Sequence, residues 1–252
     1  HKNTKEKFDK FKIETSEIDS RAIIKKILGL NDKDFIMDIE ILLSLKENQC
    51  LSKVISERLS GKPLSRIFGS KEFFSMRFAI NEFVLDPRPE SEILVEKALD
   101  LIQENNFKSI LELGVGSGCI IASILSNSIG TKAVGVDISE QAIMTAKSNL
   151  IKNGIKNFDL VVSDWGLSLN RTFDIIISNP PYIKTNEIKN LNKNVKDHDP
   201  LISLDGGLDG LDCYRVIANQ STHLINDKGY ILVEIGHDQA KGVEKIFGNN
   251  DF

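Results

Sequence analysis

The sequence predicts an α/β protein in which a doubly wound, mostly parallel sheet follows a small helical bundle and a β-hairpin. Two observations lead to this fold class. After residue 87, short apolar stretches alternate with helical stretches, which is the pattern of a parallel sheet with crossover helices. Before residue 71, apolar residues recur instead at three- and four-residue spacing, as they do in amphipathic helices.

Residues 1–70 form the first predicted domain, and they contain three apolar stripes at helical spacing. The stripes consist of Ile18, Ala22, Ile23 and Ile27 in the first helix, Phe35, Ile39, Leu42 and Leu43 in the second, and Leu51, Val54, Ile55 and Leu59 in the third. Ser16 is a candidate N-cap of the first helix. The third helix is expected to end near Gly61 and Pro63, since both residue types interrupt helices.

Residues 71–86 are rich in aromatic and β-branched side chains and predict a β-hairpin linker between two domains. These side chains are Phe73, Phe74, Phe78, Ile80, Phe83 and Val84. The domain boundary is placed near Leu85, so that residues 87–252 form the second predicted domain.

The second domain is expected to alternate strands with helices. The expected strands are Ser109 to Leu113, Ala133 to Asp137, Asp159 to Val162, Phe173 to Ser178 and Gly229 to Ile235, and the expected helices are Glu92 to Gln103, Cys119 to Leu125, Glu140 to Asn153 and Cys213 to Leu224. A polar connection from Ile183 to Asp212 has the length of a functional lid or a disordered segment. The chain stops at Phe252, where a sixth strand is expected to begin, so the last strands are expected to be missing, and His1 is a candidate expression remnant.

Charge and composition limit the class of partner. The 252 residues include 32 Lys and Arg against 36 Asp and Glu, a formal net charge of −4, which argues against a broad phosphate-binding face. A nucleic acid is therefore disfavoured as direct substrate, and a protein is easier to accommodate. Cys50, Cys119 and Cys213 lack zinc-site spacing, so no metal is expected and the thiols are interpreted as reduced packing residues of a cytoplasmic protein. No apolar run reaches the length of a membrane span.

A glycine-rich turn follows the first expected strand of the sheet and opens a helix; it consists of Gly114, Val115, Gly116, Ser117 and Gly118. Glycine lets the backbone approach a ligand where a Cβ would collide, so these residues are candidate cofactor-binding residues. A tight strand-to-helix turn without a ligand is the alternative. The G-x-G-x-G spacing differs from the G-x-G-x-x-G dinucleotide fingerprint, which disfavours a nicotinamide oxidoreductase.

Acidic and aromatic residues follow the next two strands. Asp137 ends the second strand, where a carboxylate can accept hydrogen bonds from both hydroxyls of a ribose. Asp164 can accept from an exocyclic amine, and Trp165 can stack on a purine. The alternatives are a helix N-terminal acid for Asp137 and a Trp165 side chain packed in a loop. Together with the glycine turn, these residues outline a site for S-adenosylmethionine or another adenosyl ligand.

The fourth expected strand leads into Asn179-Pro180-Pro181-Tyr182. Proline restricts its own backbone and lacks an N–H, so carbonyl oxygens and the Asn179 side-chain oxygen can face a ligand as acceptors. A planar NH2 group needs two such acceptors, and Tyr182 adds an aromatic face or a hydroxyl. Asn179, Pro180 and Tyr182 are therefore candidate catalytic residues, Pro181 completes the candidate substrate site, and Asn179 is also a candidate cofactor contact. A turn that only ends a strand is the alternative.

These acceptors suit methyl transfer to an amide or amine nitrogen. The lone pair of an amide nitrogen is delocalised, as the rotational barrier of roughly 18 to 20 kcal/mol shows. Acceptors on both N–H bonds bind more strongly as the nitrogen becomes positive during attack on a sulfonium methyl, so they favour the transition state over the ground state. No general base is required before the transfer.

The N-P-P-Y sequence and two further stretches resemble one family over nearly the whole chain. The first stretch is Pro87-Arg88-Pro89-Glu90-Ser91, where the family usually has Thr at the last position; the second contains Asp199-Pro200, Leu204-Asp205-Gly206-Gly207-Leu208-Asp209-Gly210-Leu211 and Tyr214-Arg215. The chain thus resembles the release factor glutamine methyltransferases, also called HemK or PrmC, which have a Rossmann-like class I methyltransferase domain. N-P-P-Y alone is shared with DNA adenine and RNA guanine methyltransferases, so the other stretches carry the substrate assignment.

The resemblance implies a substrate, a cofactor and a role for each motif. The implied reaction methylates N5 of the glutamine in the Gly-Gly-Gln motif of peptide chain release factors, with S-adenosylmethionine as methyl donor and S-adenosylhomocysteine as product. By resemblance Gly114, Gly116 and Gly118 line the cofactor, Asp137 binds its ribose, Trp165 lies on the adenine, and Asn179 to Tyr182 hold the glutamine. Residues 1–70 are implied to dock the release factor.

Two other functions stay open, and the second belongs to another functional class. An N6-adenine or N2-guanine nucleic-acid methyltransferase would use the same acceptors for a planar exocyclic NH2 group. A non-catalytic adenosyl-binding module would bind the cofactor without transferring its methyl group.

Overall fold

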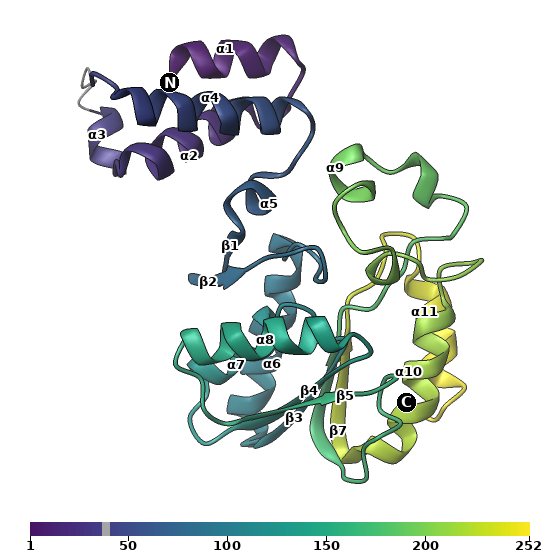
Figure 1. Ribbon diagram of the computed structural model, residues 1–252. Helices are drawn as coiled ribbons and strands as arrows, with labels where there is room; N and C mark the ends of the chain where they lie inside the picture. The colour runs from purple at the N-terminus through teal and green to yellow at the C-terminus, as the bar shows by residue number, and fades with distance from the viewer. Residues whose placement is uncertain (37–40) are drawn as a thin grey trace. The chain divides into compact units, whose positions relative to one another are not determined.

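The computed structural model describes residues 1–36 and 41–252. The chain divides into two compact units, His1–Phe68 and Gly69–Phe252 (Figure 1). Within the described ranges, no helix combines the length and the apolar character needed to cross a membrane.

The first unit is helical and consists of α1 (Lys2–Lys10), α2 (Ser16–Leu28), α3 (Asp32–Ile36), α4 (Leu45–Leu59) and α5 (Leu64–Phe68). Its core contains Phe8 from α1, Ile23 from α2, and Val54 and Ile55 from α4. Helices α2 and α4 also share a buried ion pair, in which Arg58 Nε donates to Asp19 Oδ2 at 2.6 Å. Pairing is required here because a buried charge without a partner is strongly destabilising.

The first predicted stripe matches this core in part. Ile23 is buried, but Ile18 is 69% exposed. The two residues are five positions apart, which is about 140° around a helix, so they cannot share one face. The predicted cap is shifted by one residue, since Thr15 occupies the N-cap position and α2 begins at Ser16.

The second predicted stripe is a helix only in part: Phe35 lies in α3, whereas Leu42 and Leu43 lie outside any helix. Leu42 lies in an irregular segment and is 99% exposed. Ser44 explains this boundary: its hydroxyl accepts from Glu47 N while the Glu47 side chain accepts from Ser44 N, a capping box that fixes the start of α4 at Leu45. Ile39 lies outside the described residues. The third stripe coincides with α4.

The second unit begins with an antiparallel hairpin of β1 (Ser70–Phe73) and β2 (Met76–Ala79). Its two-residue turn, Phe74 and Ser75, has the positive φ values that such turns require. Phe73 and Phe78 are buried in the main core of this unit. The hairpin that the sequence assigned to a linker at residues 71–86 is therefore packed into the second unit.

A parallel sheet follows, made of β3 (Ser109–Leu113), β4 (Lys132–Asp137), β5 (Phe158–Val162), β6 (Phe173–Ser178) and β7 (Ile225–Val233). The strand order is β5-β4-β3-β6-β7, and every neighbouring pair is parallel. The order reverses beside β3, and ligands of open α/β sheets bind at the carboxyl ends of the strands at such a reversal. Two expected strands have the observed bounds, whereas the last one begins earlier than expected, at Ile225.

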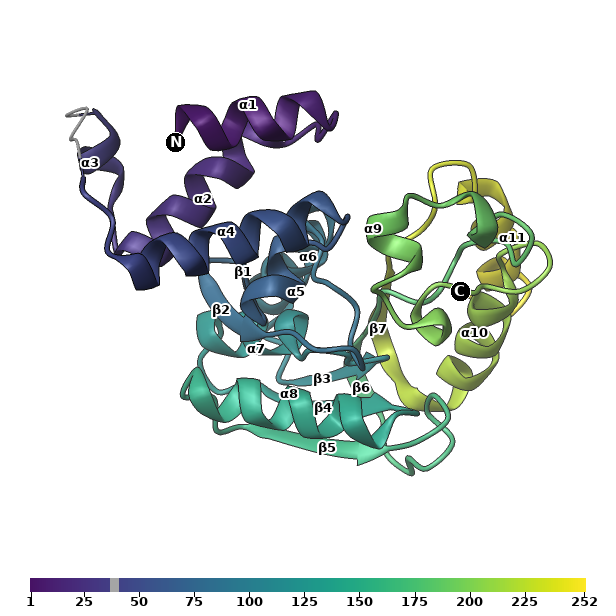
Figure 2. The same ribbon diagram turned by 45° about the horizontal axis from the view of Figure 1, so that its top comes forward.

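Helices cover both faces of this sheet (Figure 2). One core cluster joins α6 (Glu92–Asn105), α7 (Cys119–Asn127) and α8 (Glu140–Lys152) to Ile110, Ile175 and Ile177. The other joins α10 (Asp212–Leu224) and α11 (Ala240–Gly248) to Leu111, Leu113 and Ile176. Successive strand residues point to opposite faces, so a sheet covered on both sides needs strands that are apolar throughout. The predicted fold class is confirmed, although α11 was not among the expected helices.

The connection from residue 183 to residue 212 is folded. It contains η2 (Ile188–Asn190), α9 (Lys193–Lys196) and η3 (Leu201–Ser203). Its first residue forms a short parallel bridge with residues 204–206, where Ile183 N donates to Leu204 O at 3.0 Å and Gly206 N donates to Ile183 O at 2.8 Å. The connection is therefore a loop with a hydrogen-bonded base, which we call the 183–212 loop.

Candidate active site

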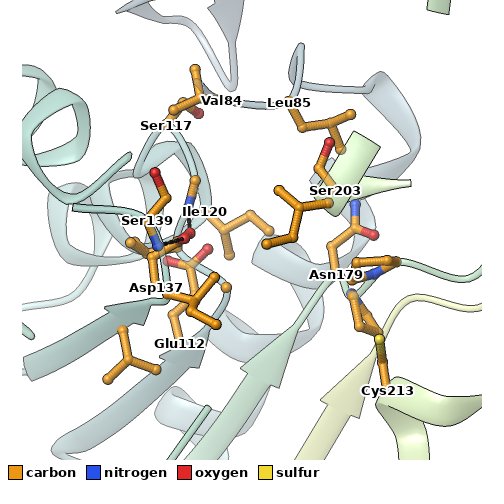
Figure 3. A pocket seen from close by; sticks show the side chains of 18 of the residues that line it. Val84, Leu85, Glu112, Ser117, Ile120, Asp137, Ser139, Asn179, Ser203 and Cys213 are labelled. Carbon is orange, nitrogen blue, oxygen red and sulfur yellow. Dashed lines mark hydrogen bonds between the residues drawn. The ribbon is translucent and has the colours of Figure 1, made fainter. Parts of the chain in front are cut away.

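A cavity of about 300 Å³ lies at the carboxyl ends of β3, β4, β5 and β6 (Figure 3). Its lining brings together most of the predicted site residues, namely Gly114, Val115, Gly116, Ser117, Asp137, Asp164, Trp165, Asn179, Pro180 and Pro181. Figure 3 shows Asp137 and Asn179 on opposite sides of this cavity. Gly118 and Tyr182 are not among the described residues that line it.

Backbone hydrogen bonds hold the glycine turn. The N–H groups of Gly114 and Val115 both donate to Val136 O, at 2.9 and 2.8 Å, and so join the end of β3 to β4. Gly114 and Gly116 have φ values of 76° and 52°, and a Cβ there would meet nothing closer than 4.0 Å. Their conformation favours glycine, and the space beside them is open.

Gly118 differs from the other two glycines of the turn. It is the N-cap of α7, with φ of 77°. A Cβ at this position would lie 3.2 Å from Ala146 Cβ and 3.3 Å from Leu150 Cδ1, both on α8. The sequence grouped Gly118 with the cofactor residues, whereas the structure places it where α7 and α8 approach each other closely.

Asp137 connects the glycine turn to the start of α8. Its Oδ2 accepts from Gly116 N and its Oδ1 accepts from Ser139 N, both at 2.9 Å. Burial raises the pKa of Asp137, while the hydrogen bonds from Ser139 and Gly116 lower it. Each carboxylate oxygen keeps acceptor capacity for one more donor.

Glu112 is a second carboxyl group in the cavity wall, and sequence reasoning gave it no role. It is 2% exposed, and its Oε2 accepts from Ile121 N at 3.0 Å. Burial raises its pKa well above the ordinary Glu value, and the charge of Asp137 raises it further. A cationic ligand group in the cavity would favour the ionised form of Glu112.

Trp165 was expected either to stack on a ligand or to pack within the protein, and its position allows both. Its side chain packs against the core cluster of α10 and also lines the cavity. Its φ of 51° is in the left-handed region, which is uncommon for a bulky residue. The next residue, Gly166, is required by close packing, since a Cβ there would lie 2.3 Å from Leu224 Cδ1. Asp164 is exposed and lines the same cavity.

Asn179 follows β6 at a point where the end of β7 lies alongside, since Glu234 N donates to Ser178 O at 3.0 Å. Asn179 Nδ2 donates to Ser91 Oγ at 2.9 Å, and Ser91 Oγ donates to Glu234 Oε2 at 2.5 Å. Because Nδ2 is engaged with the protein, Oδ1 is the atom of the Asn179 amide that can accept from a ligand.

A second cavity, of about 470 Å³, adjoins the first. The two share the lining residues Leu85, Arg88, Asn179, Pro180 and Ser203. Tyr182 and Glu234 line the second cavity. Asn179 and Pro180 therefore lie where the two cavities meet.

Burial and the charge of Glu234 raise the pKa of Tyr182, so its hydroxyl keeps its proton at neutral pH. Burial also raises the pKa of the Cys119 and Cys213 thiols, to about 12 and about 11. Both thiols line the first cavity, and in the protonated form neither is a nucleophile. Over residues 1–36 and 41–252, no group of three or more His, Cys, Asp or Glu side chains is placed to hold a metal ion.

The two stretches quoted for the family resemblance meet in an ion pair. Arg88 Nη2 donates to Asp199 Oδ2 at 2.6 Å, and the Asp199 side chain is 2% exposed. The pair ties the 183–212 loop to the segment before α6. Arg88 also lines both cavities, so the residue that holds the 183–212 loop in place is itself part of the site.

Two buried polar residues fix the backbone around the second cavity. Gln239 Nε2 donates to Tyr182 O at 2.9 Å and to Gly210 O at 3.0 Å, so it joins the N-P-P-Y segment to the 183–212 loop. The Tyr214 hydroxyl donates to Glu234 O at 2.9 Å. Buried polar groups of this kind are costly unless they are satisfied, and satisfied networks make a site rigid.

Sequence reasoning missed Ser91, Glu234, Glu112 and Gln239 as site residues. Ser91 ends the Pro87–Ser91 motif, and Glu112 lies two residues before the glycine turn. Their positions in or beside these motifs could have indicated both residues. Glu234 and Gln239 belong to no motif. Only the position of Glu234 after the last strand, at the ligand-binding edge of the sheet, could have indicated it.

The fold and the site together define a Rossmann-like methyltransferase. Residues 89–197 match the family model described as the methyltransferase small domain. The crystal structure of a methyltransferase from Pyrococcus furiosus has a TM-score of 0.51 at 15% identity and covers 79% of this chain and 87% of that chain. A SAM-dependent methyltransferase from Agrobacterium tumefaciens also has a TM-score of 0.51, at 14% identity over 72% of this chain and 57% of that chain. At these identities the two structures support the fold alone.

The chain belongs to the release factor glutamine methyltransferase family. The release factor glutamine methyltransferase of Agrobacterium fabrum is 36% identical over 240 residues, which cover 93% of this chain and 83% of that protein. The bifunctional methyltransferase of Rickettsia typhi is 33% identical over 98% of this chain and 52% of that protein. Residues 2–69 match the PrmC N-terminal domain. The resemblance inferred from the motifs is confirmed, and the chain is a methyltransferase.

Proposed function

We propose that this protein methylates N5 of the glutamine in the Gly-Gly-Gln motif of peptide chain release factors, with S-adenosylmethionine as the methyl donor, and thereby supports translation termination. The observation that carries the proposal is the junction of two cavities at Asn179 and Pro180. A methyl donor in the first cavity and an amide nitrogen in the second can approach each other only at this junction. The family relatives named for this reaction support the choice of substrate.

The residues of the first cavity fit S-adenosylmethionine. The open space beside Gly114 and Gly116 admits a ligand close to the backbone. Asp137 has acceptor capacity for the ribose hydroxyls, and Trp165 offers an aromatic surface for the adenine, with Asp164 as an acceptor for its amine. We further propose that Glu112 faces the cationic part of the ligand, which would favour its ionised form.

The chemistry at the junction rests on hydrogen-bond acceptors. When bound, S-adenosylmethionine supplies an electrophilic methyl group. Asn179 Oδ1 and the Pro180 carbonyl oxygen accept from the two N–H bonds of the substrate amide and so stabilise the positive charge that grows on its nitrogen. Pro181 lacks an N–H and presents no competing donor. Tyr182, with its hydroxyl protonated, borders the amide in the second cavity.

The Gly-Gly-Gln motif suits this narrow approach. Two glycines place almost no side-chain volume beside the glutamine and allow backbone conformations that other residues resist. We assign the 183–212 loop to the entrance of the second cavity, since Leu191, Val195 and Ser203 line it. Residues 1–70 are assigned to docking of the release factor, which the match to a family-specific N-terminal domain supports. Residues 71–86, whose hairpin packs into the second unit, and residues 87–252 together form the proposed methyltransferase part of the chain.

The test incubates the protein with methyl-labelled S-adenosylmethionine and one of three acceptors. These are a full release factor, the same factor with Gln→Ala in its Gly-Gly-Gln motif, and a short peptide of that motif. We expect label on the full factor only at the glutamine, by mass spectrometry of the product, and a much slower reaction of the peptide because remote contacts order the substrate.

Each other outcome contradicts a defined part of the proposal. Label on the Gln→Ala factor excludes the glutamine, and preferential label on DNA or tRNA would favour a nucleic-acid methyltransferase. Binding of the cofactor without transfer to any acceptor would indicate a binding module. Equal rates on the peptide and the full factor would contradict only the docking role of residues 1–70.

A further inference from the structure

The Asn179 amide is the end of a chain of hydrogen bonds that begins at Glu234. Ser91 Oγ stands between them, 2.9 Å from Asn179 Nδ2 and 2.5 Å from Glu234 Oε2. The three residues come from the end of β6, from the short helix η1 (Pro89–Ser91) and from the residue after β7. Glu234 and Asn179 both line the second cavity.

When Glu234 is ionised, the hydrogen bonds that join Asn179, Ser91 and Glu234 allow only one arrangement of their protons. A carboxylate accepts but does not donate, and a serine hydroxyl has a single proton. Ser91 therefore donates to Glu234 and presents lone pairs to Asn179. An amide oxygen facing those lone pairs would be repelled, so Asn179 turns its NH2 group toward Ser91 and keeps Oδ1 for the ligand.

A protonated Glu234 would permit the opposite arrangement. Its hydroxyl would donate to Ser91 Oγ, and the Ser91 proton would then point to Asn179. The Asn179 amide could rotate by half a turn and accept from Ser91 through Oδ1. The NH2 group of Asn179 would then face the NH2 group of the substrate, and two donors cannot form a hydrogen bond. Asn179 Oδ1 would no longer be available to accept from the substrate in the transition state.

We propose that Glu234, acting through Ser91, is a positioning residue that orients the Asn179 amide and thereby makes methyl transfer depend on the ionisation of Glu234. This inference deepens the proposed function, because it rests on Asn179 Oδ1 accepting from the substrate amide. The Tyr214 hydroxyl donates to the Glu234 carbonyl oxygen and so fixes the backbone position from which the carboxyl group reaches Ser91.

The charges around Glu234 give the direction of the pH dependence. Burial raises its pKa, the hydrogen bond from Ser91 and the neighbouring Asn179 amide group lower it, and the charge of Glu90 raises it while that of Arg88 lowers it. Tyr182 and His237 line the same cavity, and Tyr214 contacts its carbonyl oxygen. The pKa of Glu234 lies above the ordinary Glu value. The active, ionised form is therefore lost as the pH falls through this raised value, and the transfer rate falls with it.

The first experiment measures single-turnover transfer to a full release factor as a function of pH. The variants are Glu234→Gln, Ser91→Ala and Ser91→Thr, and Glu96→Gln, an exposed glutamate of α6, is the matched control. We expect Glu234→Gln and Ser91→Ala to lower the transfer rate about 10- to 100-fold with unchanged affinity for S-adenosylmethionine. The acid limb of the wild-type profile should disappear in Glu234→Gln. Ser91→Thr retains a hydroxyl group, so it should retain both the transfer rate and the acid limb of the pH profile. The control Glu96→Gln should retain both as well.

The second experiment needs no catalysis. The side-chain amide of Asn179, labelled with ¹⁵N, is followed by NMR during a pH titration. Its two proton resonances should shift with the ionisation of Glu234 in the wild type and should not titrate in Glu234→Gln. Amide resonances that titrate in neither protein would overturn the proposal.

The two proposals fail in different ways. A wild-type protein that methylates no release factor contradicts the proposed function, while the NMR titration still decides the orientation of Asn179. An active wild type whose rate and acid limb persist in Glu234→Gln contradicts the positioning role alone.

Discussion

The two sides of the first cavity are built differently. On one side, the glycine turn and Asp137 are joined by a hydrogen bond between residues 21 positions apart. On the other side, Asn179 bonds to Ser91 over 88 positions and Ser91 bonds to Glu234 over 143 positions. We call these the glycine-turn side and the Asn179 side. The first is a local product of one β-α-β unit, and the second is assembled from the distant ends of the domain.

The difference matches what each side is proposed to do. A cofactor that many enzymes share can be bound by a local unit whose backbone N–H groups and glycines form the wall. An acceptor that acts on a growing charge needs a fixed orientation, and several elements packed together hold a side chain more rigidly than one loop does.

The largest effect is expected on the Asn179 side. Asn179→Ala should lower the single-turnover rate about 100- to 1,000-fold, because it removes an acceptor that is used most strongly in the transition state. Affinity for S-adenosylmethionine, measured by calorimetry, should fall much less than the rate, although Asn179 also lines the first cavity. Asn179→Asp keeps an acceptor but adds charge, so it separates the acceptor role from the amide. A rate within a few-fold of wild type in Asn179→Ala would mean that this side does not act on the transferring nitrogen.

On the glycine-turn side, the expected effect is on binding. Asp137→Ala should weaken the binding of S-adenosylmethionine by about 1.5 to 3 kcal/mol, roughly ten- to hundredfold in affinity, because a charged acceptor for the ribose is lost. The exposed Asp227 on β7 provides a control, since Asp227→Ala should leave affinity unchanged. Unchanged calorimetric affinity in Asp137→Ala would remove this residue from the cofactor site.

Two glycines of the same turn differ in what an added Cβ would meet. Gly118→Ala should lower the free energy of unfolding by about 1 to 3 kcal/mol, because the new Cβ meets α8 and the backbone is left-handed. Gly116→Ala should lower the free energy of unfolding by about 1 to 2 kcal/mol, because of its backbone conformation alone. It should nevertheless weaken cofactor binding more than Gly118→Ala does. Denaturant titration and calorimetry measure both quantities. If Gly118→Ala had the larger effect on cofactor affinity, its assignment to helix packing would be wrong.

The smallest effect concerns the anchor of the 183–212 loop. A double-mutant cycle of Arg88→Ala and Asp199→Asn should give a coupling free energy of about 1 kcal/mol, since Arg88 is partly exposed and its attraction to Asp199 is screened by solvent. Denaturant unfolding of the wild type, the two single variants and the double variant supplies the cycle. Additive losses would show that the pair does not couple the loop to the segment before α6.

Local patterns in the sequence were sufficient for much of the second unit. The alternation of apolar strands with helices identified every strand of the sheet, because strand segments that are covered on both faces are mostly apolar, and it missed the polar start of β7. In the first unit the same patterns identified α4 but failed for the second stripe, where Leu42 is exposed. Spacing alone cannot show that a capping box at Ser44 starts the next helix after that residue.

The candidate site divides in the same way. Local sequence patterns were sufficient to indicate the glycine turn, Asp137 and the N-P-P-Y segment as candidate site residues, because each follows a strand and parallel strands bring their carboxyl ends to one edge. Three contacts became visible only in the folded chain: Gly118 packs against α8, Arg88 pairs with Asp199, and Ser91 and Glu234 hold the Asn179 amide. The physical reason is that a hydrogen bond depends on distances of about 3 Å. Residues that lie far apart along the chain reach such distances only when the sheet, its helices and the 183–212 loop have packed together.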